Sequence, residues 1–163
     1  DKPNATTDYA GAWNDTAPSS TVITLGNDSV VNQSLATYVA YAFADVEGFS
    51  KMGMYRGNGG VNGSAVIVGF KPAFLLIKSS GASQNWLMYD SSRSPYNEVD
   101  DQLTANDATA ETTGSEEIDI LATGFKCRTN DGALNTAGHI YIYAAFASHP
   151  FGGGEDVTPA TAF

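Results

Sequence analysis

Residues 135–147 read NTAGHIYIYAAFA and residues 32–44 read NQSLATYVAYAFA, so one stretch occurs nearly twice at a constant offset of 103 positions (135 minus 32). In the second copy, isoleucines and tyrosines alternate from Ile140 to Tyr143, which puts the two residue types on opposite faces of a strand. Each copy follows an Asn-Asp turn, at 27–28 or 130–131. We therefore expect two equivalent turn-and-strand elements that pack tyrosine and phenylalanine on the core.

The rest of the chain repeats this β signal in short runs between turns. Residues of the β-branched and aromatic types cluster between Gly, Pro, Asn and Ser, and no stretch has a useful helical period. We expect an all-β fold, an antiparallel β-sandwich of jelly-roll-like type with about nine strands and almost no helix. The expected strands are residues 21–26, 37–44, 52–56, 65–70, 73–78, 85–90, 118–121, 125–128 and 139–147.

A chain of 163 residues suits one domain. Residues 1–18 are polar and rich in turn formers, and we interpret them as an N-terminal arm or linker anchored by Trp13. Residues 19–163 then form a single β-sandwich domain. Within it, residues 91–117 carry few apolar side chains, and so long a connection is expected to be functional, interfacial or partly mobile.

The charge balance disfavours two classes of partner. The chain has 18 acidic and 8 basic residues, for a net charge of −10, and contains no basic run that would bind phosphates. Its apolar runs are far shorter than the roughly 20 residues that span a bilayer. We expect no direct nucleic-acid partner and no membrane insertion.

The sequence does not place histidines and cysteines at the spacings that common catalytic or metal centres need. His139 and His149 flank one strand on the order of 33 Å long, too far apart for a shared site. Cys127 is the only cysteine, and we interpret it as a small buried hydrophobe. The glycine-rich stretch 56–63 lacks the features of a phosphate-binding loop and is interpreted as a hairpin turn. We expect no enzyme activity, cofactor or metal.

A shallow ligand site is the remaining candidate. Its expected residues are Tyr55, Tyr96, Asp100 and Asp101, from the loops 53–64 and 91–117. Calcium at the acidic loop residues is an open alternative, although their spacing matches no EF-hand. Trp86 is a further candidate for an aromatic platform that binds sugar, but we favour a position in the core for its side chain.

The order of short motifs resembles a known but uncharacterised family. Most of the chain is similar to a C-terminal domain of tailed-phage virion proteins of the tail or fibre type, common in marine phages and often placed after a concanavalin-like or laminin-G-type domain. The motifs that carry the resemblance are Trp13-Asn14-Asp15, Tyr38–Ala44, Val46–Lys51, Tyr55–Gly59, Gly69–Phe74, Trp86–Asp90, Arg93, Pro95-Tyr96-Asn97, Gly124-Phe125-Lys126 and Tyr141–Phe151.

The resemblance implies a bacteriophage virion structural protein on the particle surface. Its expected task is display, host attachment or decoration, on a tail fibre, tail tip or capsid. The expected partners are other virion proteins, further copies in a trimeric or hexameric arrangement, and a host surface glycan. A lectin-like carbohydrate-binding module and a glycan depolymerase are the alternatives.

Overall fold

The computed structural model describes residues 8–114 and 117–149. The expected arm residues 1–7 and the end of the expected domain, 150–163, lie outside the described residues. Contacts between residues divide the chain into two compact units, one formed by Thr6–Ala42 and the other beginning at Phe43. The expected boundary at residues 18 and 19 thus differs from the division by contacts, which places residues 19–42 with the arm.

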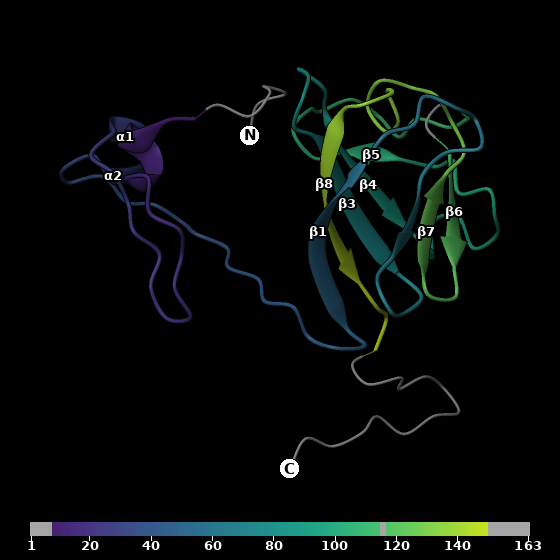
Figure 1. Cartoon of the computed structure of the whole chain (residues 1–163), viewed down its shortest axis with the longest axis horizontal. Helices are drawn as coiled ribbons and strands as arrows, with labels where there is room; N and C mark the ends of the chain where they lie inside the picture. The colour runs from purple at the N-terminus through teal and green to yellow at the C-terminus, as the bar shows by residue number, and fades with distance from the viewer. Residues whose placement is uncertain (1–7, 115–116, 150–163) are drawn as a thin grey trace, which may run out of the picture. The chain divides into compact units, whose positions relative to one another are not determined.

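The larger unit is built from two antiparallel sheets (Figure 1). One sheet has five strands in the order β1-β8-β3-β4-β5, and the other has three in the order β2-β7-β6. The strands are β1 (Ser50–Arg56), β2 (Ala65–Ile67), β3 (Phe74–Ser79), β4 (Trp86–Asp90), β5 (Leu103–Thr104), β6 (Ile118–Leu121), β7 (Gly124–Cys127) and β8 (Ile140–Phe146). The fold is all-β and sandwich-like, as the sequence predicts.

The smaller unit contains two single-turn helices and otherwise irregular chain. They are α1 (Ala10–Trp13) and α2 (Ser29–Asn32). Asp28 precedes α2, and its side chain accepts a hydrogen bond from the amide of Val30, which satisfies a free N–H of the first turn. Large apolar side chains of this unit are exposed, Tyr38, Val39 and Tyr41 among them. This unit therefore has little core of its own among the described residues.

Strand β8 organises the core of the larger unit. It lies between β1 and β3, so both of its edges are hydrogen-bonded. Tyr141, Tyr143 and Ala145 point inward and are buried, while the alternate residues from Ile140 to Phe146 point outward. Phe125 on β7 contacts Tyr143 edge-on at 5.4 Å between ring centroids and so ties the two sheets together.

Seven of the nine expected strands are present, and two are not. Residues 21–26 and 37–44 form no strand, although their composition favours one. The two-residue strand β5 is an addition that was not expected, because it is short and lies within the polar connection 91–117. Strand formation needs a partner, and among the described residues no backbone hydrogen bond joins residues 37–43 to a neighbour.

The expected equivalence of the repeated stretches holds for the turn and fails for the strand. Each copy carries the same five hydrogen bonds at the same offset. In the first copy they are Val30 N to Asp28 Oδ1, Asn32 N to Asp28 O, Asn32 Nδ2 to Gly26 O, Tyr38 OH to Ser29 O and Gln33 N to Tyr38 OH. In the second copy, in the same order, they are Ala133 N to Asp131 Oδ1, Asn135 N to Asp131 O, Asn135 Nδ2 to Thr129 O, Tyr141 OH to Gly132 O and Thr136 N to Tyr141 OH. We call residues 26–44 the N-terminal motif and residues 129–147 the C-terminal motif.

Candidate functional site

The long connection between β4 and β6 is held by many hydrogen bonds. Val99 exchanges backbone hydrogen bonds with Ile118, at 2.7 and 3.0 Å. The Asn97 side chain donates to the carbonyl of Ile120 and accepts from its amide, at 3.0 and 2.9 Å. These contacts fasten residues 97–99 to the edge of β6. The described part of the loop, 91–114 and 117, therefore presents its outward side chains from a defined backbone.

Asp101 has a structural part in this loop. Its two carboxylate oxygens accept hydrogen bonds from the hydroxyls of Ser94 and Thr113, at 2.8 and 2.9 Å. The hydrogen bond from Ser94 and then the one from Thr113 lower the pKa of Asp101, with a further contribution from the charge of Arg93. Asp100 lies beside it, but its side chain has no part in this network.

Because its folded-state pKa is depressed, ionised Asp101 stabilises the fold above the ordinary pKa of 3.8, and this contribution is lost as pH falls through the folded value. We expect Asp101→Ala to lower the denaturant midpoint at neutral pH, while the neighbouring change Asp100→Ala leaves it nearly unchanged. Denaturant titrations at pH 7 and pH 3 measure both. A difference between Asp101→Ala and the unaltered chain that is as large at pH 3 as at pH 7 would contradict this role of the carboxylate.

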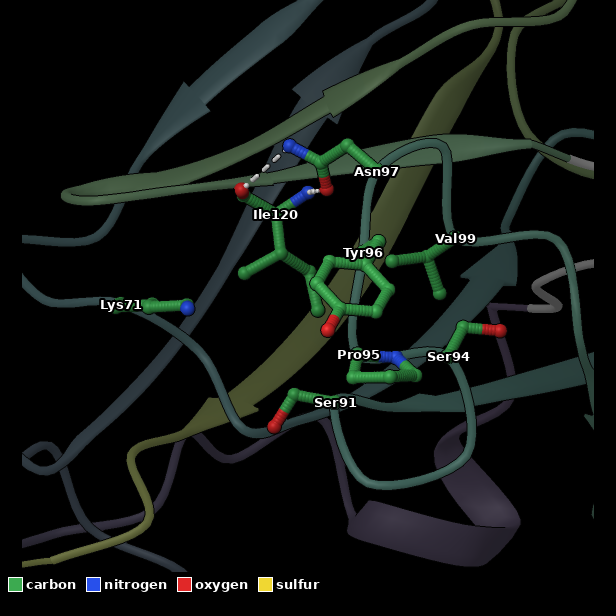
Figure 2. A pocket seen from close by; sticks show the side chains of 8 residues that line it. All are labelled: Lys71, Ser91, Ser94, Pro95, Tyr96, Asn97, Val99 and Ile120. Atoms are coloured by element: carbon green, nitrogen blue, oxygen red, sulfur yellow. Dashed lines mark hydrogen bonds between the residues drawn. The ribbon is translucent and has the colours of Figure 1, made fainter.

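An open pocket of about 180 Å³ lies where this loop meets the β2–β3 connection (Figure 2). Figure 2 shows Tyr96 in the middle of the lining, with Lys71 and Ser91 to one side. The full lining is Lys71, Ser91, Ser94, Pro95, Tyr96, Asn97, Val99 and Ile120. Its volume is below the roughly 300–1,000 Å³ of pockets that enclose a drug-sized ligand, so it suits one small ring or side chain.

Buried residues lie beside Lys71 and close to Tyr96 in the chain. Lys71 stands between Phe70 and Pro72, which are both buried, so the lysine is directed outward from a fixed backbone. Ser94 is buried, and its hydroxyl donates to Asp101, which fixes the start of the Pro95-Tyr96 segment. Tyr96 itself is 83% exposed, so its ring is available to a ligand.

The lining supports binding rather than acid–base chemistry. It contains an ammonium, two hydroxyl-bearing serines, a phenol and an amide, and no carboxylate, imidazole or thiol is among its residues. Paired carboxylates, which a glycosidase of the usual kind needs, are thus missing from this pocket. An exposed tyrosine beside hydroxyl and ammonium donors can stack on a sugar ring and hydrogen-bond its hydroxyls.

The structure separates the four residues expected at the ligand site. Tyr96 lines the pocket, Asp101 lies behind it as a partner of Ser94, and Asp100 does not line it. Tyr55 is a core residue, which corrects its assignment to a surface site: its ring stacks on Tyr141 at 5.1 Å, and its hydroxyl donates to the carbonyl of Leu134. Burial raises the pKa of Tyr55 well above its ordinary value.

Sequence reasoning missed Lys71 and Ser91. Lys71 comes from a connection twenty or more residues before Tyr96 along the chain, and only the fold brings the two together. The nearest signal was the Lys71-Pro72 pair directly before β3, because a residue that precedes proline is held in extended conformation and can present its side chain steadily.

A family model matches this chain. The sequence model of the family described as Domain of unknown function (DUF7483) matches residues 1–150. The chain belongs to the DUF7483 family. No curated protein and no solved structure matches it.

The described residues also bear on metal binding and membrane crossing. In the part of this DUF7483 chain that the structure describes, no group of three or more His, Cys, Asp or Glu side chains is arranged to hold a metal ion. Within the same residues, no helix has the length and apolar character needed to cross a bilayer.

The outer face of the five-stranded sheet of this DUF7483 domain carries an apolar depression of about 470 Å³. Trp86 lies in its lining, together with Phe43, Met52, Leu76 and Ile142. The expected core position of Trp86 is therefore corrected: Leu87 and Tyr89 are the buried residues of β4, while Trp86 points to the opposite, half-exposed face.

Cys127 is fully buried on β7, in line with its interpretation as a small hydrophobe. Burial is the main cause that raises the pKa of its thiol to about 11. Because the thiolate is the reactive form, we expect Cys127 to be inert toward a thiol reagent in the native protein at pH 8 and to react fully in denaturant. Native labelling at the denatured rate would show that the core around β7 opens readily.

Proposed function

We propose that this DUF7483 domain is a bacteriophage virion structural protein that displays a host-attachment or decoration surface on a tail fibre, tail tip or capsid. The resemblance of its ordered motifs to phage virion domains motivates the context. The arrangement of the candidate site favours a binding role within that context, since a firmly held loop presents an aromatic ring and polar groups without acid–base partners.

The observation that carries this proposal is the pocket at Tyr96. The ring is 83% exposed, while the backbone beneath it is fixed through Asn97 and Ser94. A side chain that is exposed on a rigid support loses little conformational freedom when it binds, which favours recognition over mere solvation. The ligand that this chemistry fits is a host surface glycan, held by stacking on Tyr96 and hydrogen bonds from Lys71 and Ser91.

The same pocket favours a lectin-like carbohydrate-binding module as the second candidate. The two functions share one binding event and differ in where the protein works. Imaging of the intact particle with a label on this chain distinguishes them, because a virion protein is found at a fixed place on the particle and a free lectin is absent from it.

A glycan array tests the binding event. We expect reproducible hits with the unaltered protein, loss of those hits with Tyr96→Ala, and a reduction of roughly tenfold or more in affinity with Lys71→Ala. Tyr41→Ala is the matched control, because Tyr41 is 82% exposed and lies outside the pocket lining. Hits that survive Tyr96→Ala unchanged would refute the pocket as the glycan site.

The proposed virion role includes self-association in a trimeric or hexameric arrangement, since positions on virions are related by symmetry. Size-exclusion chromatography with light scattering measures the molar mass directly. A multiple of the 17.1 kDa chain mass at high concentration agrees with this part of the proposal, and a strict monomer speaks against it.

A further inference from the structure

The two motifs differ in what surrounds them. The C-terminal motif is completed by the segment 50–60: β1 pairs along one edge of β8, and the loop after β1 closes over Asn135. Asn135 accepts from the amide of Asn58 at 3.0 Å and donates to Asn58 Oδ1 and to the carbonyl of Gly60 at 2.9 and 2.8 Å. Strand β3 occupies the other edge of β8.

The N-terminal motif has the same internal hydrogen bonds but lacks these neighbours. The Asn32 amide nitrogen keeps only the bond to Gly26 that lies within the motif, among the bonds between described residues. Tyr38 is 47% exposed where its counterpart Tyr141 is 0% exposed, and residues 39–43 expose Val39, Tyr41 and Phe43. An extended apolar segment with unpaired backbone groups is a template for strand pairing.

The surroundings of the C-terminal motif show which neighbours the N-terminal motif lacks. A strand like β1 must pair on one side, a strand like β3 on the other, and a Gly-Asn-Gly loop must reach the asparagine side chain. The chain's own β1 and β3 do not meet this need, because the edges that would hold a closing strand between them are already paired with β8. The occupant is therefore a further copy of this kind of domain in which the place of the closing strand is open.

We propose that the N-terminal motif is the closing element of a second sandwich of the same kind, whose β1-type and β3-type strands receive residues 37–44 between them. Residues 45–49 then form the whole connection between that sandwich and β1 of this one. The Val46–Ser50 bridge and the ion pair of Asp45 with Lys51 hold this connection in a compact turn. The two sandwiches therefore follow each other closely along the chain.

The interaction surface is thus a strand-insertion surface for a like domain, independent of the pocket at Tyr96. It extends the proposed virion function without depending on it, because strand insertion requires no glycan and the glycan site requires no second sandwich. Each can fail in its own experiment.

A fused chain tests the proposal. Residues 43–112 are repeated ahead of the complete 163-residue chain, so that the extra segment supplies copies of β1 to β5 and the N-terminal motif supplies the closing strand. Residues 15–24 stand at the places of β6 and β7, by the same offset of 103 positions. The join falls at the exposed segment equivalent to residues 107–111, where added residues are tolerated. Residue-resolved hydrogen exchange is measured on the fused chain and on the unaltered chain.

We expect the amides of residues 39–43 to exchange roughly 100-fold or more slowly in the fused chain than in the unaltered chain. Tyr38→Ala in the fused chain is expected to remove most of that protection, since Tyr38 takes the place of the buried Tyr141. Unchanged exchange of residues 39–43 would overturn the proposal.

A second fused chain controls for folding in tandem. It repeats residues 43–147, so that its first sandwich closes with a copy of β8 instead of the N-terminal motif. If this control is soluble and folded while the test chain aggregates or leaves residues 43–112 unstructured, the N-terminal motif is unable to close a sandwich and the proposal is overturned.

Discussion

Replacement of Asn135 by alanine is expected to lower the free energy of unfolding by about 3 kcal/mol, near the upper end of what a single polar residue contributes. Asn135 is fully buried, and its side chain bonds two other segments, one at Asn58 and Gly60 and the other at Thr129. The truncation removes the side-chain partners of the Asn58 amide and the Gly60 carbonyl from a part-buried network, and a polar group that loses its partner away from water costs free energy. Denaturant unfolding followed by tryptophan fluorescence measures the loss.

Asn32→Ala is the matched control for this change. Asn32 occupies the same position of the repeated motif and makes the same internal hydrogen bond, but it is exposed. We expect its replacement to change the free energy of unfolding of the sandwich by less than about 0.5 kcal/mol. Equal effects of the two substitutions would mean that the contacts to Asn58 and Gly60 contribute nothing.

Phe125→Ala is expected to cost about 4 kcal/mol, the largest effect of the substitutions considered. The Phe125 ring is completely buried, and it contacts Tyr55 and Tyr143 edge-on at 5.8 and 5.4 Å between ring centroids. Since Phe125 comes from the three-stranded sheet and both tyrosines from the five-stranded sheet, its removal opens a cavity between the two layers. Differential scanning calorimetry and denaturant titration report the loss independently.

Tyr41→Ala serves as the control for loss of an aromatic ring. Tyr41 is exposed, so we expect little change in the unfolding midpoint. If Phe125→Ala were as mild as Tyr41→Ala, the two sheets would not share the core described above.

Much of the sandwich follows from local pattern. Alternation of apolar and polar residues with period two places Leu87 and Tyr89, or Tyr141 and Tyr143, on one face, and these residues are buried. Local pattern does not say whether a strand finds a partner. Residues 37–44 and 140–147 have similar sequences, yet only the second copy lies between two other strands, because β1 and β3 are placed beside it by the rest of the fold.

The candidate site was predictable in part. The exposure of Tyr96 follows from its place in a polar loop after proline. Tyr55 was misplaced because it stands near a glycine-rich turn, although the period of β1 puts it on the inward face with Gly53. Lys71 joins the pocket only through the fold, and the role of Asp101 depends on the hydroxyls of Ser94 and Thr113, which no short motif connects.

The central claim is that one hydrogen-bonded motif occurs twice and that only its C-terminal copy is built into a sheet. Residue-resolved hydrogen exchange of the unaltered chain compares residues 38–43 with residues 141–146 in a single measurement. The expected result is exchange of residues 141–146 that is slower by roughly 100-fold or more, because both edges of β8 are paired. Equal protection of the two segments would contradict the account.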